Sequence, residues 1–183
     1  QIKNEIRQHK IQVFSSNYAL YADISNRVMQ LLGEEAPAIE VYSIDEAFLD
    51  LTGIDSCTSF NDFGLHLRTK ILQQTGITIC VGIAPTKTLA KLANWAAKQY
   101  PATGGVVDLS CPERQKRLLK LVPVEEVWGI GRRTAPKLEA LGIHTALDLA
   151  TSNASSLGRQ FSVVLERTAR ELQGISCLEL EEV

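Results

Sequence analysis

The sequence contains no apolar run of 18 or more residues, so it predicts no membrane-spanning helix. It also has no large excess of one charge, because 19 Lys and Arg against 21 Asp and Glu give a net charge of −2. The whole chain therefore lacks the basic character of many nucleic-acid-binding proteins, which leaves only a local basic patch open. Neither an initiator Met nor a basic and apolar leader occurs at Gln1, which predicts a fragment or a processed product.

Cysteine is scarce, and its spacing excludes two common uses of the residue. The four cysteines form neither a CxxC pair nor a recognisable disulfide framework, and the three histidines are equally scattered. A Cys/His zinc site is therefore not expected, and reduced thiols in a cytoplasmic protein are the simpler interpretation. The cysteines are Cys57, Cys80, Cys111 and Cys177.

The composition is that of a globular protein, with 45% hydrophobic and 22% charged residues in 183. Hydrophobic spacing changes near Ser110. Before it, the pattern predicts the order helix, strand, strand, helix, strand, helix, strand; after it, only short helices follow. This order predicts an α+β fold with a split βαβ sheet and helices on one face, followed by a small all-α domain.

The expected elements of the first part follow from capping residues, apolar spacing and chain breakers. Ser15 or Ser16 would cap the first helix, and Pro85 would lie in the first turn of the third. The predicted helices cover 15–33, 60–72 and 85–99, and the predicted strands cover 39–44, 47–51, 77–83 and 106–109. The first two of these strand segments are a pair of strands or one bent strand.

Two adjacent carboxylates, Asp45 and Glu46, lie between apolar strands and follow Ser43. In a regular strand they would point to opposite faces, so both reach one site only at a strand end, turn or bulge. With a third carboxylate, they would hold Mg²⁺ through hard oxygen ligands. Two such ions about 3.5–4 Å apart would stabilise the attacking and leaving oxygens of a phosphoryl transfer. The alternative is a solvated turn, where Asp and Glu are common.

Three lysines, Lys87, Lys91 and Lys98, share one face of the third predicted helix, and no acidic residue occurs from residue 83 to 107. A row of unpaired charges would suit a polyphosphate or a nucleic-acid backbone, and the alternative is a solvated helix face. The segment is not a P-loop, because its spacing is one residue short and the second Gly is missing.

Residues 124–149 have the pattern of a helix-hairpin-helix around Gly129 and Gly131. The two glycines would let backbone N–H groups approach a DNA phosphate. From residue 114 to 137 there are seven basic and two acidic residues, which predicts a local basic patch. The alternative is an ordinary Gly-rich turn between helices, but the extended pattern favours phosphate binding.

These motifs together resemble the Y-family of translesion DNA polymerases. Residues 42–50 (YSIDEAFLD) resemble the palm signature of that family, residues 81–93 resemble the palm helix that follows, and residues 127–133 (VWGIGRR) resemble the thumb hairpin. Within the family, the sequence is most similar to the UmuC-type catalytic subunit of bacterial DNA polymerase V. The segments that carry this similarity are residues 14–23, 104–110 and 163–168.

The resemblance implies a role for each motif. Asp45 would bridge two Mg²⁺ ions, and Glu46 would hold the ion that activates the primer 3′-hydroxyl. Lys98 matches the lysine that contacts the incoming triphosphate, and Ser43 would lie near the primer end. The DNA-binding residues would be Gly129, Gly131, Arg132, Arg133 and Lys137, with Lys87 and Lys91 on the palm helix.

The resemblance also implies a division into the end of a fingers region (1–14), a partial palm (15–110) and a thumb with its helix-hairpin-helix (111–183). The first metal-binding Asp and the aromatic residue that excludes ribonucleotides would lie upstream, and a little-finger domain downstream. The piece alone is therefore expected to be inactive. The full enzyme would transfer nucleotides from dNTP to a primer 3′-hydroxyl, with errors, in SOS-type DNA damage tolerance.

Primer–template DNA and dNTP would be the substrates, and the family suggests UmuD', RecA and the sliding clamp as partners, in the bacterial cytoplasm and at the nucleoid when active. Two rival hypotheses remain. One is a non-enzymatic helix-hairpin-helix module of a repair protein, in which Asp45 and Glu46 would be dispensable. The other is a palm-fold nucleotide cyclase, which has no reason to carry residues 124–149.

Overall fold

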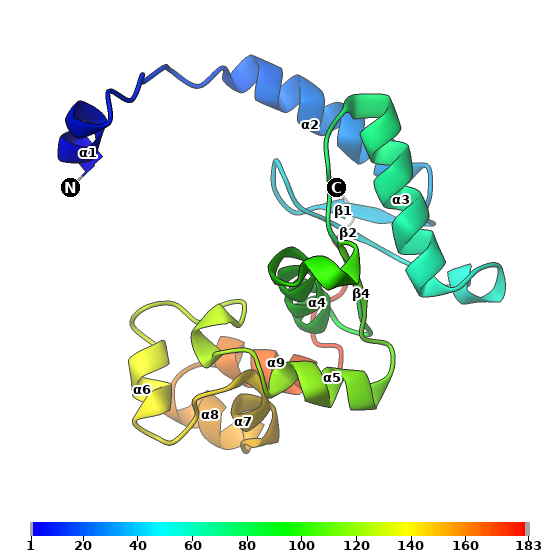
Figure 1. Ribbon diagram of the computed structural model, residues 1–183. Helices are drawn as coiled ribbons and strands as arrows, with labels where there is room; N and C mark the ends of the chain where they lie inside the picture. Colours follow the sequence, from blue (N-terminus) through cyan, green and yellow to red (C-terminus); the bar gives the residue numbers. More distant parts are fainter. Residues whose placement is uncertain (1, 182–183) are drawn as a thin grey trace.

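The computed structural model describes residues 2–181, and its elements form an upper α+β part and a lower helical part (Figure 1). The upper part contains α1 (Ile2–Gln8), α2 (Tyr18–Gly33), β1 (Ile39–Val41), β2 (Ala47–Leu49), η1 (Ile54–Ser56), α3 (Phe60–Thr75), β3 (Val81–Ile83), α4 (Lys87–Gln99), η2 (Pro101–Thr103) and β4 (Val106–Asp108). The lower part contains α5 (Pro112–Leu119), η3 (Val124–Glu126), α6 (Ala135–Glu139), α7 (Ala146–Thr151), α8 (Ala154–Gln160) and α9 (Val163–Leu172). The predicted fold class, α+β followed by all-α, is confirmed.

The strands of the upper part form two separate pairs. β1 and β2 are antiparallel, with Ile39 opposite Leu49 and Val41 opposite Ala47, so the predicted strand pair is a hairpin. β3 and β4 are parallel, with Val81 opposite Val106. Within residues 2–181, β2 has no neighbour on the side away from β1, and β3 has none on the side away from β4.

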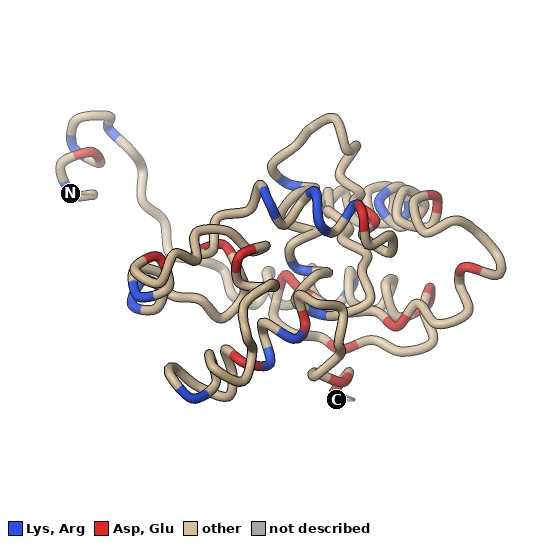
Figure 2. The backbone as a smooth tube through the Cα atoms, turned by 90° about the horizontal axis from the view of Figure 1, so that it is seen from below, with Lys and Arg blue, Asp and Glu red and all other residues tan. Residues whose placement is uncertain are grey.

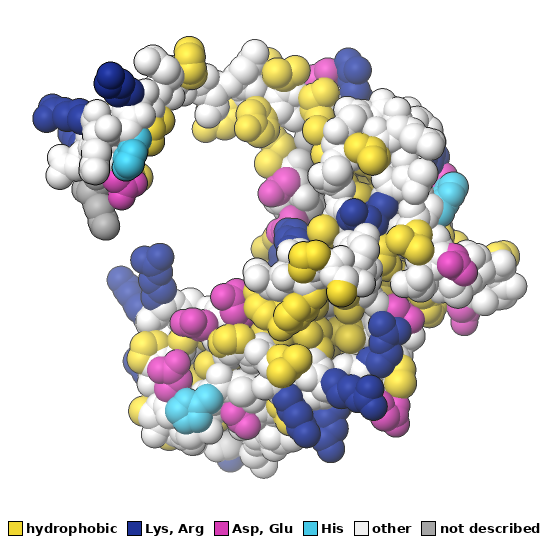
Figure 3. Space-filling model, viewed as in Figure 1, with side chains coloured by type: hydrophobic (Ala, Val, Ile, Leu, Met, Phe, Trp, Pro, Cys, Tyr) yellow, Lys and Arg dark blue, Asp and Glu magenta, His cyan; other side chains and the backbone are white. Residues whose placement is uncertain are grey.

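Helix starts differ from the sequence prediction by a few residues. The cap of α2 is Asn17, not Ser15 or Ser16, because its side chain accepts the N–H of Leu20 at 3.1 Å. The cap of α4 is Thr86, so Pro85 precedes the helix instead of lying in its first turn. The helix α1 was not predicted. It and the extended segment after it lie apart from the rest, across an opening from α6 (Figures 1 and 3).

Two cores hold the chain together, and α4 lies in the larger one. The smaller core joins α2 and α3 around Leu67 and Ile71, which are 1% and 0% exposed. The larger core runs from α4 and β4 into every helix of the lower part, with Leu89, Leu138 and Leu149 fully buried. The two parts of the molecule therefore share one apolar interior.

A buried carboxylate also joins the two parts. Glu171, at the end of α9, is fully buried; its Oε2 accepts the N–H of Thr88 at 3.0 Å and its Oε1 accepts the N–H of Cys177 at 2.7 Å. The Thr86 hydroxyl donates to the Glu171 backbone carbonyl at 2.9 Å. The carboxylate lies at the N-terminus of α4, where unpaired N–H groups and the helix dipole favour a negative charge.

No helix among residues 2–181 is long and apolar enough to cross a bilayer.

Candidate active site and nucleic-acid interface

The loop between β1 and β2 brings the two candidate metal ligands to a strand end. The N–H groups of Tyr42 and Ser43 both donate to the Glu46 carbonyl at 3.0 Å, which closes a tight loop over residues 42–46. The Ser43 hydroxyl donates to Asp45 Oδ1 at 2.7 Å, and the Ser25 hydroxyl of α2 donates to the Ile44 carbonyl at 2.6 Å. Asp45 and Glu46 thus lie outside the regular strands, as a shared site requires.

Glu46 forms an ion pair with Lys91 of α4, with Oε2 and Nζ 2.9 Å apart. The same ammonium lies over three aromatic rings: its distance to the ring centroid is 4.5 Å for Tyr42, 5.0 Å for Trp128 and 6.0 Å for Phe48. All three distances are within the range of a cation–π interaction. We call Tyr42, Phe48 and Trp128 the ring cage. Trp128 precedes the turn at Gly129 in the lower part, so the cage connects the two parts of the molecule.

The first lysine of the row, Lys87, is also paired. Its ammonium donates to Glu40 of β1 and to the Glu179 carbonyl, and the Glu181 N–H donates to Glu40 Oε2 at 2.7 Å. Burial raises the pKa of Glu40, but the hydrogen bonds from Lys87 and the Glu181 N–H outweigh it and hold this pKa below its ordinary value.

The expectation of three unpaired lysines is therefore wrong for Lys87 and Lys91. Their acidic partners, on the β1–β2 hairpin, lie 47 and 45 residues earlier in the chain, where a search of the helix itself cannot find them. Lys98 is exposed and has no salt bridge within the described part of the chain. Whether any of the three contacts DNA or nucleotide stays a prediction.

The donor chemistry of the loop suits Mg²⁺, but its ligand number is too small. Asp45 and Glu46 offer the hard carboxylate oxygens that Mg²⁺ prefers. Within residues 2–181, however, no three His, Cys, Asp or Glu side chains come together around one point. The residues present fit part of a metal site, which a further ligand would have to complete.

A groove of about 1500 Å³ runs between the two strand pairs, and both carboxylates line it. Its walls include all of β2 and β3, apolar side chains of α2 and α3 such as Val28 and Phe63, and Lys91 and Lys98 of α4. Asn94 Oδ1 in the same wall is buried without a hydrogen-bond partner within the described residues. The unpaired strand edges and this acceptor leave the groove suited to a further strand.

The predicted helix-hairpin-helix is present in the lower part. η3 leads to the turn at Gly129, whose φ of +85° is in the left-handed region. α6 follows, Gly142 ends it with a φ of +81°, and Thr145 caps α7 in a capping box with Asp148. Within residues 2–181, the backbone N–H groups of Gly129 and Gly131 have no acceptor, and both glycines are exposed. They are available to an anion outside the protein.

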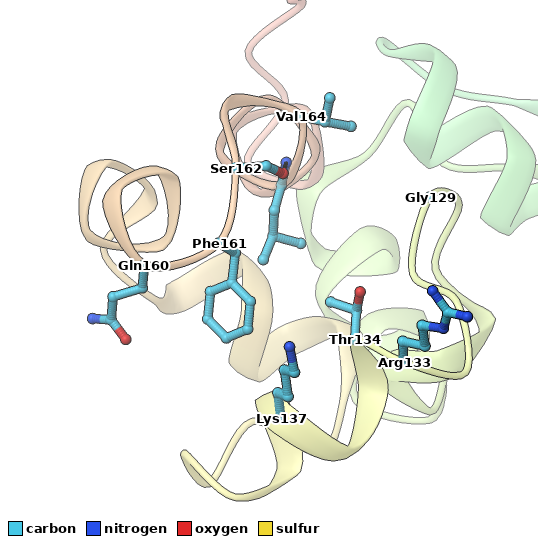
Figure 4. A pocket seen from close by; sticks show the side chains of 9 residues that line it. Gly129, Arg133, Thr134, Lys137, Gln160, Phe161, Ser162 and Val164 are labelled. Atoms are coloured by element: carbon cyan, nitrogen blue, oxygen red, sulfur yellow. Dashed lines mark hydrogen bonds between the residues drawn. The ribbon is translucent and has the colours of Figure 1, made fainter.

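A small pocket of about 260 Å³ lies beside this turn, between α6 and the start of α9 (Figure 4). Arg133 and Lys137 point toward it from one side, and Gln160, Phe161 and Ser162 lie on the other. The basic patch is smaller than the sequence indicated, because α5 with its three basic side chains lies at the opposite end of the lower part from α6 (Figure 1). Figure 2 likewise shows the basic positions distributed over the molecule.

Sequence reasoning missed the residues that surround the charged groups. Neither the ring cage nor Glu40 was singled out, because their contacts with α4 join distant parts of the chain. Trp128 carried one signal, because it immediately precedes Gly129 in the quoted hairpin motif. Gln160 and Ser162 carried none.

Comparison with known proteins gives the family. Residues 2–95 match the model of the impB/mucB/samB family, and residues 112–143 match the HHH motif of that family. The chain is 58% identical to Protein UmuC of Salmonella typhimurium over 98% of its own length and 43% of that protein. It is 39% identical to DNA polymerase IV of Saccharolobus solfataricus over 70% of its length and 36% of that protein.

Solved polymerase structures share the fold. An insertion ternary complex of Dbh DNA polymerase superposes with a TM-score of 0.80 at 28% identity, covering 98% of this chain and 52% of that one. DinB from Sulfolobus solfataricus gives a TM-score of 0.77 at 29% identity with the same coverage. The chain spans less than half the length of the curated relatives that it matches. The resemblance to Y-family polymerases, and to UmuC in particular, is confirmed, and the chain belongs to the impB/mucB/samB family.

Proposed function

We propose that this chain is the central part of an error-prone translesion DNA polymerase that acts in SOS-type damage tolerance. The observation that carries the proposal is one groove lined by Asp45, Glu46 and Lys98, with an anion-accessible hairpin in the adjoining part. The relatives named UmuC and DNA polymerase IV support the assignment. The non-enzymatic module is less favoured, because it gives no reason for two carboxylates at the loop end.

Asp45 and Glu46 would hold two Mg²⁺ ions, which when bound would neutralise the charge that develops during phosphoryl transfer. Ser43, hydrogen-bonded to Asp45, would orient that carboxylate near the primer end. Lys98 has no carboxylate partner among the described residues and would face the triphosphate of the incoming dNTP, a point-charge role that Lys fills well.

A strand upstream of this sequence in the longer protein would fill the groove between β2 and β3. Its backbone would pair with the two free strand edges, and its side chain would bring the missing third carboxylate to Asp45 and Glu46. The apolar groove walls and the unpartnered Asn94 Oδ1 support this arrangement. The chain without that strand would be inactive.

The thumb would hold the duplex by its backbone. The free N–H groups of Gly129 and Gly131 would meet a phosphate, and Arg132, Arg133 and Lys137 would add charge without reading bases. Partners in the cell would be primer–template DNA and, by analogy with UmuC, UmuD', RecA and the sliding clamp. The protein would work in the bacterial cytoplasm, at the nucleoid when active.

Primer extension by the full-length polymerase with Mg²⁺ tests the proposal. Asp45→Ala and Glu46→Ala should each reduce nucleotide addition by at least about a thousandfold, because each removes transition-state charge stabilisation worth several kcal/mol. Thermal stability should change little, since both side chains are partly exposed. Glu139→Ala, an exposed carboxylate of α6 outside the groove, is the matched control. Near-normal extension by both loop variants would remove the polymerase assignment of these residues.

A further inference from the structure

The Lys91 ammonium lies where three chemically different neighbours meet. Glu46 of the loop supplies a carboxylate oxygen at 2.9 Å, Tyr42 and Phe48 supply two rings from the same hairpin, and Trp128 supplies a ring from the lower part. The rings also contact one another, with the centroids of Tyr42 and Trp128 5.5 Å apart in an edge arrangement. The ammonium therefore has a built site on the protein itself.

Partial burial makes this ion pair more than a surface contact. The Lys91 side chain is 20% exposed and the Glu46 side chain 34%. Water screens such a pair less than a fully exposed one, and the negative faces of the rings favour a cation at this point. The ring cage therefore stabilises an ammonium beside Glu46.

A metal ion at Glu46 would compete with this ammonium for the same charge. Two cations that share one carboxylate repel each other at a distance of a few ångströms. A divalent ion that binds Glu46 must first break the Lys91–Glu46 pair. The free energy of that pair therefore makes the binding free energy of the ion less favourable.

We propose that Lys91 is a positioning residue that holds Glu46 against the ring cage, and that a divalent cation binds Glu46 by displacing this ammonium. The inference rests on the proposed function, because it takes Glu46 as a metal ligand. When displaced, the ammonium stays among Tyr42, Phe48 and Trp128, so that metal binding in the palm changes the contact made by the residue before the thumb hairpin.

Binding of Mn²⁺ alone to the full-length polymerase, without DNA or nucleotide, tests the competition. Free Mn²⁺ is measured by electron paramagnetic resonance. Lys91→Met should bind Mn²⁺ about two- to fivefold more tightly than the parent, since a partly exposed pair is worth up to about 1 kcal/mol. Met fills the cage with a side chain that packs well on aromatic rings. Lys91→Arg keeps the charge and should remain close to the parent.

Lys116→Met is the matched control. It removes the same charge from an exposed lysine of α5 that has no ion pair within the described residues and does not line the groove. Its Mn²⁺ affinity should differ from that of the parent by less than about twofold. Equal tightening in Lys91→Met and Lys116→Met would reduce the effect to general charge and overturn the inference.

A second readout follows the ring cage in the parent enzyme and does not depend on the Lys91 variants folding. In protein labelled with 5-fluorotryptophan, the Trp128 fluorine resonance is the one that Trp128→Phe removes. Mg²⁺ should shift this resonance in the parent and leave it unmoved in Glu46→Gln. A Trp128 resonance that ignores Mg²⁺ in the parent overturns the displacement.

Glu46→Gln separates the two proposals. If it fails to weaken Mn²⁺ binding, Glu46 is not a metal ligand and the proposed function of that residue is lost. If it weakens binding while Lys91→Met binds Mn²⁺ no more tightly than the parent, Glu46 remains a ligand and only the role of Lys91 is wrong.

Discussion

The three lysines on one face of α4 show what residue spacing can and cannot predict. Helix geometry places Lys87, Lys91 and Lys98 on a common face, and the structure agrees. Lys87 pairs with Glu40, which lies 47 residues earlier, and Lys91 pairs with Glu46, which lies 45 residues earlier. Helix spacing alone cannot reveal either pair. Such pairs depend on how the hairpin packs against α4, which no local pattern records.

Glu40→Gln should destabilise the chain by roughly 3 kcal/mol at neutral pH, because it leaves the Lys87 ammonium buried without its counter-charge. The pKa of Glu40 is lowered in the folded state. Its stabilising effect is therefore fully present above the unfolded pKa of about 4.3 and is lost as the pH falls through the folded value. Urea unfolding at pH 7 and at several values below 4.3 measures both effects.

The variant should accordingly lose less stability than the parent over the acid range. Glu139→Gln, an exposed carboxylate of α6 with no ion pair in the described part of the chain, makes the same chemical change and should stay within about 0.5 kcal/mol of the parent. If Glu40→Gln loses stability with falling pH as steeply as the parent, the buried pair is not the cause.

At the scale of elements, helices were predicted better than strands. Apolar spacing and capping residues give α2, α3 and α4 to within a few residues, because both signals are local. The strand expected at 77–83 begins only at Val81, since within the described chain the backbone of 77–80 has no strand to pair with. A strand is defined by hydrogen bonds to a neighbouring strand. The hydrophobic pattern of one segment does not show where those hydrogen bonds begin.

The packing of β3 on α4 gives an element-scale prediction. A Cβ on Gly82 would lie 2.2 Å from the backbone N of Asn94 and 2.3 Å from the carbonyl oxygen of Ala90. Both are backbone atoms of a helix and cannot move alone. Gly82→Ala should therefore cost about 3 kcal/mol or more in the free energy of unfolding, measured by urea titration.

Gly131→Ala is the matched control for this change. Nothing lies within 4 Å of a Cβ built there, and its φ is not in the left-handed region. Its stability should stay within about 0.5 kcal/mol of the parent. Equal stability of Gly82→Ala and Gly131→Ala would mean that β3 does not approach α4 so closely.

For the whole molecule, the order of the motifs was predicted, but the way its two parts meet was not. Hydrophobic spacing predicted the α+β part and the helical part, and the pattern of residues 124–149 predicted the helix-hairpin-helix. The larger core crosses residue 110, and Glu171 links α9 to the start of α4, so the boundary expected there is not a break in the interior. Figure 3 shows an opening between the N-terminal helix and the lower part, with basic side chains on the rim of the lower part and acidic ones on its inner wall.

Duplex binding belongs to this scale, because the thumb would act on DNA held across the opening. We expect the full-length polymerase to bind unrelated duplexes with similar affinity, since phosphate contacts position a protein without reading sequence. Gly131→Val should weaken binding to every duplex by a similar factor, because its side chain obstructs the approach of a phosphate to the free N–H groups. Lys137→Ala should weaken binding more mildly and reduce the slope of log affinity against log salt by about 0.9.

Titrating several unrelated duplexes over a range of salt concentrations decides the matter, with Lys116→Ala as the matched control. Lys116 lies on α5, at the opposite end of the lower part from α6, so its loss should leave the salt slope unchanged (Figure 1). A hairpin variant that loses one sequence and keeps the others would indicate base readout instead. If Lys116→Ala and Lys137→Ala lower the slope equally, the duplex contacts both ends of the lower part, and the hairpin is not the principal clamp on the DNA backbone.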